Sequence, residues 1–302
     1  MSTVGSGRQF TGARPARPVA QRGRPGRRRG PLGTVGAYTV LGVLAVIYIF
    51  PFLINLATMV KTDADASAHP LSLVPQPWSW AALTRLFGAS DFPLWFMNSV
   101  IITLCVTAGR VFFDSLAGYA LARLPFRARG AIFGALVAVM AVPGVVLLIP
   151  KFLVVNQLGM FNSYSGMIIP LLADASGVFI MKNFFESIPA SVEEAARIDG
   201  AGPFRVFWSI VLPIAAPAVT TIVILSFQGS WNELAHFIVA ANDPRLTPLT
   251  KGVAQLASGA LSSGSQYPLK LAAGALMTIP VAVVFFIFQR RIMNASGGAV
   301  KE

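Results

Sequence analysis

The most constraining feature of this chain is a series of long stretches without charged residues. In the first, from Val35 to Val60, every side chain is uncharged. A helix rises about 1.5 Å per residue, so this run can cross the roughly 30 Å hydrocarbon layer of a bilayer. Lipid offers no hydrogen-bond partners, so a spanning segment must satisfy its own backbone, which favours helices. The sequence therefore predicts an all-α membrane protein. A charged fraction of only 12%, against about 25% in soluble domains, agrees.

Six predominantly apolar runs are expected to be transmembrane helices. They cover residues 35–60, 94–120, 131–150, 166–185, 210–230 and 269–289. Residues 61–93 are polar and mixed and are expected to form an external loop. Trp78, Trp80 and the adjoining Trp95 are candidate anchors at the membrane surface. Residues 94–291 make up the expected helical core, and residues 292–302 a cytoplasmic C-terminal tail.

The distribution of basic residues orients these spans. Lys and Arg number 17 in the segments that this topology places inside and six in those it places outside, as the positive-inside rule requires. Residues 1–34 hold eight Arg and no acid, so a disordered cytoplasmic tail beside anionic lipid is expected. Arg27–Arg29 also imitate a twin-arginine signal, but the apolar run that follows is too long for a signal peptide. Both termini are thus expected in the cytoplasm, and the net charge of +12 reflects topology and not nucleic-acid binding.

Charged residues interrupt two of the expected spans. Arg110 and Asp114 lie one helical turn apart in the second span, and Asp174 lies in the fourth. Such residues are costly in lipid and usually pair or serve function. Arg110 and Asp114 are compatible with a local ion pair or with substrate selection, and Asp174 with a polar cavity or a pairing across helices. An alternative function is a secondary transporter that uses Asp114 and Asp174 as an ion or proton relay.

No pattern in the chain indicates a metal site or an enzyme. Cys105 is the single cysteine, and His69 and His236 lie far apart without ligand spacing. The sequence has no H-E-x-x-H motif. We therefore expect no metal and no catalytic residue.

The segment from Ser191 to Pro217 is polar in part and lies between two apolar runs. Ser191 and Glu194 fit a capping box, which predicts that a helix starts at Ser191. Glu193 and Arg197 are spaced as a surface ion pair, and Gly200 stands where a helix C-cap is expected. Pro203 suits the first turn of a second helix, which is expected to run on into the fifth span.

The spacing of this segment resembles a known family. Glu194-Ala195-Ala196, then Gly200, then Ile210-Val211-Leu212-Pro213 resembles the EAA loop of the membrane subunits of ATP-binding-cassette (ABC) importers. The sequences at residues 184–189, 197–201 and 229–233 look like the carbohydrate-uptake branch, and residues 117–123 are similar to the end of that family's second span. Ile279-Pro280 and residues 298–301 resemble the second of its two permeases. The resemblance covers roughly residues 94–301; the Arg-rich tail and the Arg110/Asp114 pair depart from it.

This resemblance implies a type-1 ABC importer fold and a permease subunit for a sugar or related small polar solute in the bacterial cytoplasmic membrane. The implied partners are a second permease, two ATPase subunits that bind ATP and Mg²⁺, and an extracytoplasmic solute-binding lipoprotein. This chain itself is then a transport subunit without a cofactor. The implied ATPase-coupling residues lie at 187–210 and in the fifth span: Glu194, Ala195, Ala196, Arg197, Asp199, Gly200, Phe204 and Pro213.

Three further residues leave two interpretations open. Asp199 occupies the last turn of its helix, where a carboxylate is disfavoured by the dipole by about 0.3–1 kcal/mol. It is therefore expected to have a basic partner, either Arg205 or a group on the ATPase. Trp231 and Asn232 are compatible with an external gate on the translocation path or with a turn that stabilises the fold.

Overall fold

The computed structural model describes residues 31–259 and 266–298, and these residues form helices joined by turns and loops. The expected Arg-rich tail at residues 1–30 lies outside the described residues, as do residues 260–265 and 299–302. The chain divides into two units, one up to residue 49 and one from residue 50 onward. The first long helix, α1 (Pro31–Thr58), belongs to both units.

Four of the six expected spans appear as long apolar helical segments in the described part of the chain. These are α1, α4 (Phe92–Arg123), the run Tyr164–Ser187 and α15 (Tyr267–Gly298). The run Tyr164–Ser187 contains α7 (Tyr164–Ile168), η1 (Ile169–Leu171) and α8 (Ala175–Ser187). Other short elements of the second unit are α2 (Asp63–Ala68), α3 (Ala81–Gly88), α9 (Ala190–Ile198), α13 (Ala235–Ala240), η3 (Pro244–Leu246) and α14 (Leu249–Ala257).

The third span, expected over residues 131–150, is not one helix. α5 (Arg129–Met140) has 12 residues, which at about 1.5 Å per residue is shorter than the hydrocarbon layer. Turns follow, and α6 (Leu148–Gln157) begins inside the expected span and ends beyond it. Pro143 has no N–H to donate and Gly144 is a weak helix former, so the helix ends before them.

The fifth span is also broken, contrary to the expectation of a helix continuous from the polar segment. α10 (Pro203–Val206), a π-helical turn (η2, Phe207–Val211) and α11 (Leu212–Ile214) lead to α12 (Ala216–Trp231), which is bent by 78° from them. Pro213 and Pro217 flank the bend, and neither can donate a helical hydrogen bond. If the bent pair is one span, the described residues contain five spans by length and composition.

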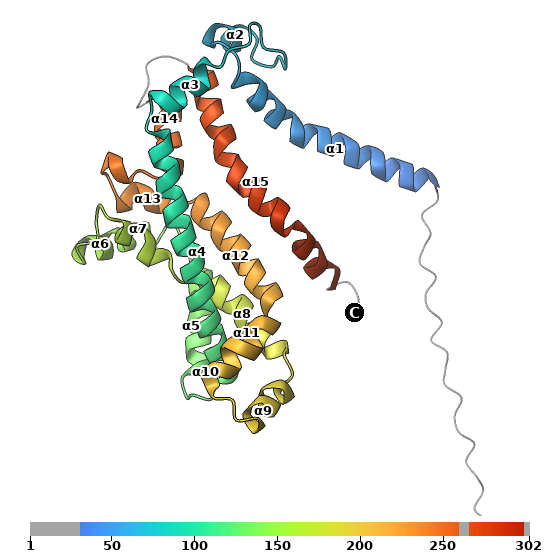
Figure 1. The fold of residues 1–302 in the computed structure, drawn as a ribbon, viewed down its shortest axis with the longest axis vertical. Helices are drawn as coiled ribbons and strands as arrows, with labels where there is room; N and C mark the ends of the chain where they lie inside the picture. Colours follow the sequence, from blue (N-terminus) through green and yellow to red (C-terminus); the bar gives the residue numbers. More distant parts are fainter. Residues whose placement is uncertain (1–30, 260–265, 299–302) are drawn as a thin grey trace, which may run out of the picture. The chain divides into compact units, whose positions relative to one another are not determined.

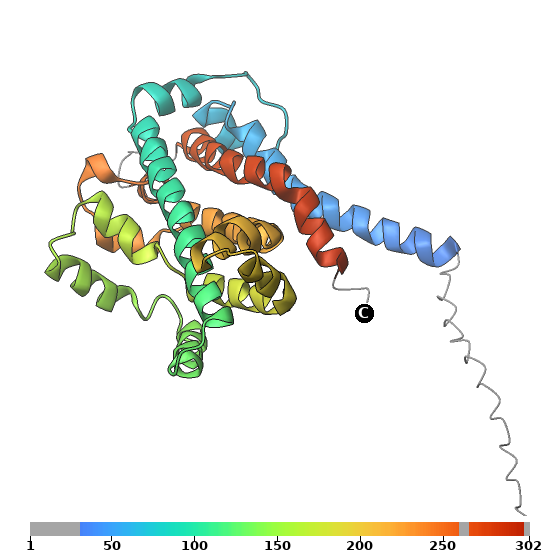
Figure 2. The same ribbon diagram turned by 60° about the horizontal axis from the view of Figure 1, so that its bottom comes forward.

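Helix α4 is the centre of the second unit. It packs along α8 and α12, and both ribbon views show it beside them (Figure 1 and Figure 2). The main core lies where α4, α8, α9 and the η2–α12 region meet, and includes Tyr119, Met181, Phe185, Phe207 and Ile222. In Figure 1, α9 and α10 lie at one end of this unit, and α2, α3 and α14 lie at the other.

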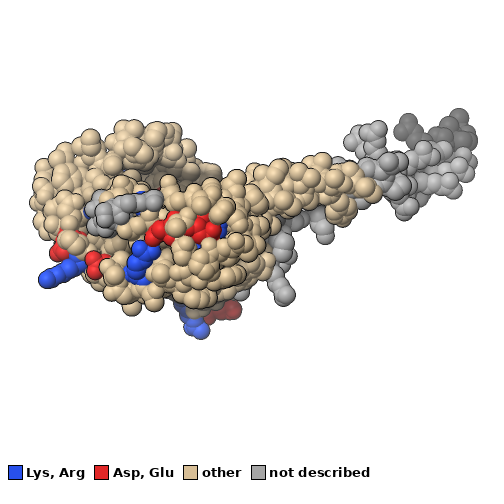
Figure 3. All heavy atoms as spheres, turned by 90° about the horizontal axis from the view of Figure 1, so that it is seen from above, with Lys and Arg blue, Asp and Glu red and all other residues tan. Residues whose placement is uncertain are grey.

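The expected external loop at residues 61–93 contains α2 and α3 and is internally bonded. Buried Lys61 donates through Nζ to the carbonyls of His69 (2.8 Å) and Ser72 (2.7 Å). Viewed from this end, most of the visible surface is uncharged, and the basic and acidic atoms form small groups (Figure 3).

The three expected tryptophan anchors do not share one environment. Trp78 and Trp80 are 66% and 62% exposed, as anchors would be. Trp95 is not exposed: it is 4% exposed and packs against α14, where a Cβ added to Gly252 would lie 2.2 Å from its ring. Trp95 is therefore a core residue, because α14 covers it.

Candidate functional site

Helix α9 does not begin with the expected capping box. Its N-cap is Pro189, it starts at Ala190, and no side chain caps its first amides. Ser191 and Glu194 therefore lie inside the helix. Ile188 and Pro189 have extended backbones (ψ 130° and 135°), as the restriction on a residue before proline favours, and this places the start of the helix directly after Pro189.

The end of α9 is the turn that the sequence predicts. Gly200 has φ +80°, which glycine adopts without the cost that other residues bear. The amide of Ala201 donates to the Ala196 carbonyl (2.9 Å) and that of Gly200 to the Arg197 carbonyl (3.0 Å). These two bonds form a Schellman motif, so the turn between α9 and α10 is short and closed.

The outer face of this turn is exposed. The exposed residues of the expected coupling set are Glu194, Ala195, Arg197, Asp199, Gly200, Phe204 and Pro213. Two apolar side chains in this region are largely exposed: Ile198 is 86% exposed and Phe204 is 78% exposed. Ala196 differs, because it is buried and faces the core. Asp199 and Arg205 form no ion pair with each other, so the intrachain partner considered for Asp199 is not used.

The inner face of α9 is held by a buried charged cluster, which we call the Arg123 latch: Arg123, Tyr119 and Glu193. Arg123 Nε lies 2.9 Å from Glu193 Oε1, and the Tyr119 hydroxyl donates to Oε2 (3.2 Å). The ion pair is close but not aligned as a hydrogen bond. Arg123 also donates to the carbonyls of Phe185 (2.6 Å) and Ile188. The latch thus joins the end of α4 to both the end of α8 and the start of α9.

Sequence reasoning missed this cluster. It assigned Glu193 to a surface pair with Arg197; that contact exists (3.5 Å), but Glu193 is only 4% exposed. Glu193 and Ala196 are three residues apart and lie on one helix face. The sequence signal that predicts the burial of Glu193 is therefore its position on the same face of α9 as Ala196, which directs its carboxylate inward.

Arg110 and Asp114 do not form the ion pair that their spacing suggested. Arg110 Nε donates to the carbonyl of Leu171 (2.8 Å), and Asp114 Oδ1 accepts from the amide of Asp174 (3.0 Å). Leu171 ends η1, and Asp174 is the N-cap of α8. Each charge thus satisfies one side of the break in the fourth span, and the Asp114 carboxylate lies at the positive end of the α8 dipole.

The packing around Asp114 is close. Its side chain is fully buried, and Oδ2 has no hydrogen-bond partner among the described residues. A Cβ on Gly177 would lie 2.0 Å from this oxygen, so only glycine fits there. The Asp174 carboxylate accepts from the hydroxyl of Ser176.

Trp231 and Asn232 lie at the end of α12 in different environments. Trp231 is 1% exposed, donates through Nε1 to the Met277 carbonyl (3.0 Å) and stacks on Phe227. Asn232 is exposed and donates to the carbonyl of Gln228 (3.0 Å), which caps the helix. Both sets of contacts stabilise the α12 end.

The described residues contain no group of three or more His, Cys, Asp or Glu placed to hold a metal. His69 contacts Asp65 (3.1 Å), and His236 Nε2 lies 3.1 Å from the Gly166 carbonyl. Burial lowers the pKa of His236, which favours its neutral form.

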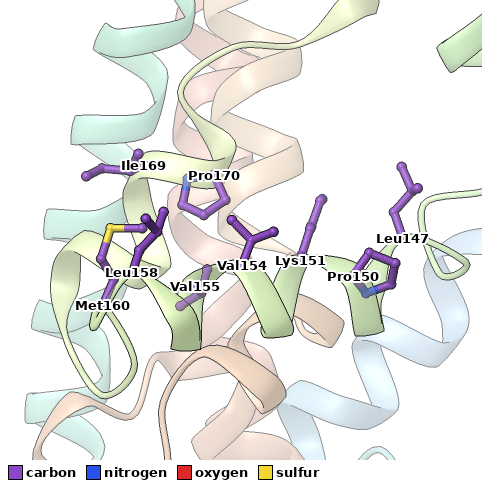
Figure 4. A pocket seen from close by; sticks show the side chains of 9 residues that line it. All are labelled: Leu147, Pro150, Lys151, Val154, Val155, Leu158, Met160, Ile169 and Pro170. Carbon is purple, nitrogen blue, oxygen red and sulfur yellow. The ribbon is translucent and has the colours of Figure 1, made fainter.

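One hollow, between α6 and η1, has a volume of about 360 Å³ (Figure 4). Its lining is apolar apart from Lys151: Leu147, Pro150, Val154, Val155, Leu158, Met160, Ile169 and Pro170. A polyhydroxylated solute needs several polar groups, so this hollow does not have the character of a sugar site.

The long apolar helices and the polar turn that projects from one end of the bundle define a multi-pass membrane protein of the transporter class. The chain belongs to the family of binding-protein-dependent transport system inner membrane components, whose model matches residues 114–295. It is therefore a permease subunit of the ABC importer type and not an ion-coupled secondary transporter. Its family is one of transport subunits and not of catalytic enzymes.

Several named transport permeases are similar in sequence to this chain over most of their length. The chain is 32% identical over 267 residues to the sulfoquinovosyl glycerol transport system permease protein SmoH of Agrobacterium fabrum (87% of this chain, 93% of the relative). It is 28% identical over 257 residues to the sn-glycerol-3-phosphate transport system permease protein UgpE of Yersinia pestis (83% and 90%). It is 29% identical over 263 residues to the arabinooligosaccharides transport system permease protein AraQ of Bacillus subtilis (86% and 92%).

A solved structure has the same fold. A chain of a bacterial ABC transporter involved in the import of the acidic polysaccharide alginate superposes with a TM-score of 0.75 at 26% identity. The match covers 86% of this chain and 95% of that one.

Proposed function

We propose that this chain forms part of the path by which a sugar or related small polar solute crosses the bacterial cytoplasmic membrane, driven by ATP hydrolysis in separate subunits. Relatives named for transport of sugar-like solutes support the solute class. The proposed assembly contains a second permease, two ATPase subunits that bind ATP and Mg²⁺, and a solute-binding lipoprotein. In this proposal the chain crosses the membrane six times, with the third, fourth and fifth spans broken and both termini in the cytoplasm.

The observation that carries the proposal is the exposed turn between α9 and α10. Ile198, at the end of α9, and Phe204, in α10, are large apolar side chains that are exposed. The hydrogen-bonded turn at Gly200 lies between them in the sequence. Exposed apolar side chains in a polar segment, with charged residues around them, fit a protein contact. We propose that this surface, with Glu194, Ala195, Arg197, Asp199 and Gly200, docks on the ATPase subunit.

A docking surface transmits movement only if it is firmly attached to the bundle. The Arg123 latch supplies that attachment, because it ties α9 to the ends of α4 and α8 through buried charged contacts. Pro213 lies just before the 78° bend into α12 and sets how the turn meets the fifth span. Movement of the ATPase would thus reach α4, α8 and α12 together.

The intramembrane charges have a different role in this proposal. Arg110 and Asp114 hold open a break in the fourth span, at residues 172–174, by satisfying the helix ends on either side of it. A broken helix inside a membrane is tolerated where it is buried in protein or lines a cavity. We propose that this break, and not a charge relay, is their contribution to the path; Asp174, Trp231 and Asn232 shape its surroundings.

The experiment uses the reconstituted importer. Asp199→Asn and Gly200→Val are expected to leave the permease inserted but to lower solute-stimulated ATP hydrolysis and uptake together. A crosslinker at position 199 should capture the ATPase subunit. Asp63→Asn, the same change made in α2 at the opposite end of the unit, is the matched control and should leave both activities unchanged. Normal coupling in both variants, together with no crosslink, would overturn the assignment, and uptake that continues without ATP would restore the ion-coupled alternative.

A further inference from the structure

A second hollow lies between α13 and α14. Figure 1 shows these two helices in the half of the second unit away from α9. Its volume is about 540 Å³, within the range of about 300–1,000 Å³ that small-molecule sites occupy. Unlike the hollow beside α6, it has several polar side chains. Its lining consists of Leu234, Ile238, Asn242, Lys251, Ala254, Gln255 and Ser258.

Lys251 is the charged group of this hollow. Its residue is 7% exposed, and its Nζ donates to the carbonyl of Ala241, the C-cap of α13. An ammonium has three N–H donors, so one carbonyl leaves donors to spare. Burial lowers the pKa of Lys251, because the charged form loses solvation there.

Lys61 is another buried lysine, to which Lys251 can be compared. Lys61 donates to two carbonyls, and the Asp65 carboxylate lies close enough to feel its charge. Lys251 has one carbonyl and forms no ion pair with any carboxylate of the described residues. A buried charge without an opposite charge beside it is costly, so an external anion would lower that cost.

The acids nearest in sequence are already engaged. Glu233 accepts the amide of His236 through Oε1 (2.9 Å), and Asp243 accepts that of Arg245 through Oδ1 (2.9 Å). The remaining polar groups beside Lys251 in the lining are the amides of Asn242 and Gln255 and the hydroxyl of Ser258. Amide and hydroxyl groups donate to oxyanions and to sugar hydroxyls alike.

We propose that the hollow between α13 and α14 is a binding site for a sugar derivative that carries an oxyanion, such as a sugar acid, with Lys251 as its charge partner. The proposal rests on the proposed function, of which it narrows the solute class. The ammonium pairs with the carboxylate, while the amides and the hydroxyl of the lining receive the ring hydroxyls. Leu234 and Ile238 offer an apolar wall for the ring face.

The test is a binding measurement without ATP or the solute-binding protein, so that its outcome is independent of coupling. The purified importer complex would be titrated with sodium glucuronate and, in parallel, with glucose, by saturation-transfer NMR at low ionic strength. Wild type is expected to bind glucuronate at least tenfold more tightly than glucose. Lys251→Met should remove this preference, and Lys251→Arg should keep most of it.

Two further variants separate binding from folding. Lys270 also donates to a helix-end carbonyl, that of Ala257 (3.2 Å), but does not line the hollow, so Lys270→Met should leave the preference intact. Gln255→Ala keeps the Lys251–Ala241 contact and should weaken glucuronate binding several-fold. Equal affinity of wild type for glucuronate and glucose would overturn the proposal whatever the variants do. An unchanged preference in folded Lys251→Met would show that Lys251 only caps α13, and would also overturn it.

Discussion

The Arg123 latch gives a prediction whose size follows from burial. The side chains of Arg123 and Glu193 are 14% and 6% exposed, so removal of the arginine leaves a carboxylate largely cut off from water. Loss of one partner from a buried pair costs about 3–5 kcal/mol. Glu193 keeps Tyr119 and a weak contact with Arg197, which favours the lower end of that range. We therefore expect Arg123→Met to weaken the attachment of α9 by about 3 kcal/mol.

The assay is local opening of α9. A cysteine at Ala196, which is 7% exposed on the inner face, reports opening by its rate of reaction with a thiol reagent, in a background where Cys105 is replaced by Ser. A change of about 3 kcal/mol corresponds to a roughly hundredfold higher rate, since about 1.4 kcal/mol is tenfold. Arg123→Met with Glu193→Leu removes both charges and should recover part of the protection, although the carbonyls of Phe185 and Ile188 still lack their donor.

A matched control is the exposed pair Arg129–Glu186 (2.9 Å), whose side chains are 38% and 37% exposed. Exposed pairs contribute about 0–1 kcal/mol, so Arg129→Met should change the rate of cysteine modification less than about fivefold. The reasoning is refuted if Arg123→Met reacts no faster than its parent. It is also refuted if the double variant is as reactive as the single one, because the cost would then not come from an unpaired buried charge.

Two further predictions concern other polar contacts. Arg110→Met and Asp114→Asn should each lower the yield of folded protein, and the double variant should not recover it, because the two side chains satisfy different helix ends; recovery, measured by size-exclusion chromatography, would restore the ion-pair interpretation. The amide of Gln76 holds the pKa of Asp65 below its usual 3.8, so the stability contributed by this carboxylate is present above that pH and is lost as the pH falls through the lowered pKa. Proteolysis of residues 61–79 should therefore increase below about pH 3.8, and Asp65→Asn should make it independent of pH there.

Local chemistry was sufficient for several features. Long apolar runs predict helices because a backbone in lipid has no other partner, and the structure has helices α1, α4 and α15 at these runs. Gly200 and Pro203 predict a turn and a helix start, since one tolerates a positive φ and the other needs no N–H. The positions of these residues along the chain carry the information by themselves.

The sequence predicts only in part where the spans are broken. Pro143-Gly144 and Pro213 mark where helices end, but whether neighbours restore a continuous span depends on packing that proline alone does not specify. The bend of 78° before α12 is the result of that packing.

The partners of the buried charged residues are distant in the chain and were not predicted from the sequence. Glu193 looked like a surface residue because the nearest basic residue in sequence is Arg197, whereas its closest basic partner in space, Arg123, lies 70 residues away in numbering. Arg110 and Asp114 looked like a pair because they share a helix face, yet each meets a backbone group about 60 residues away. Hydrogen bonds and charges act over a few ångströms in space, and distance along the chain does not measure that separation. Which charge meets which partner was therefore settled by the packing of α8 and α9 against α4.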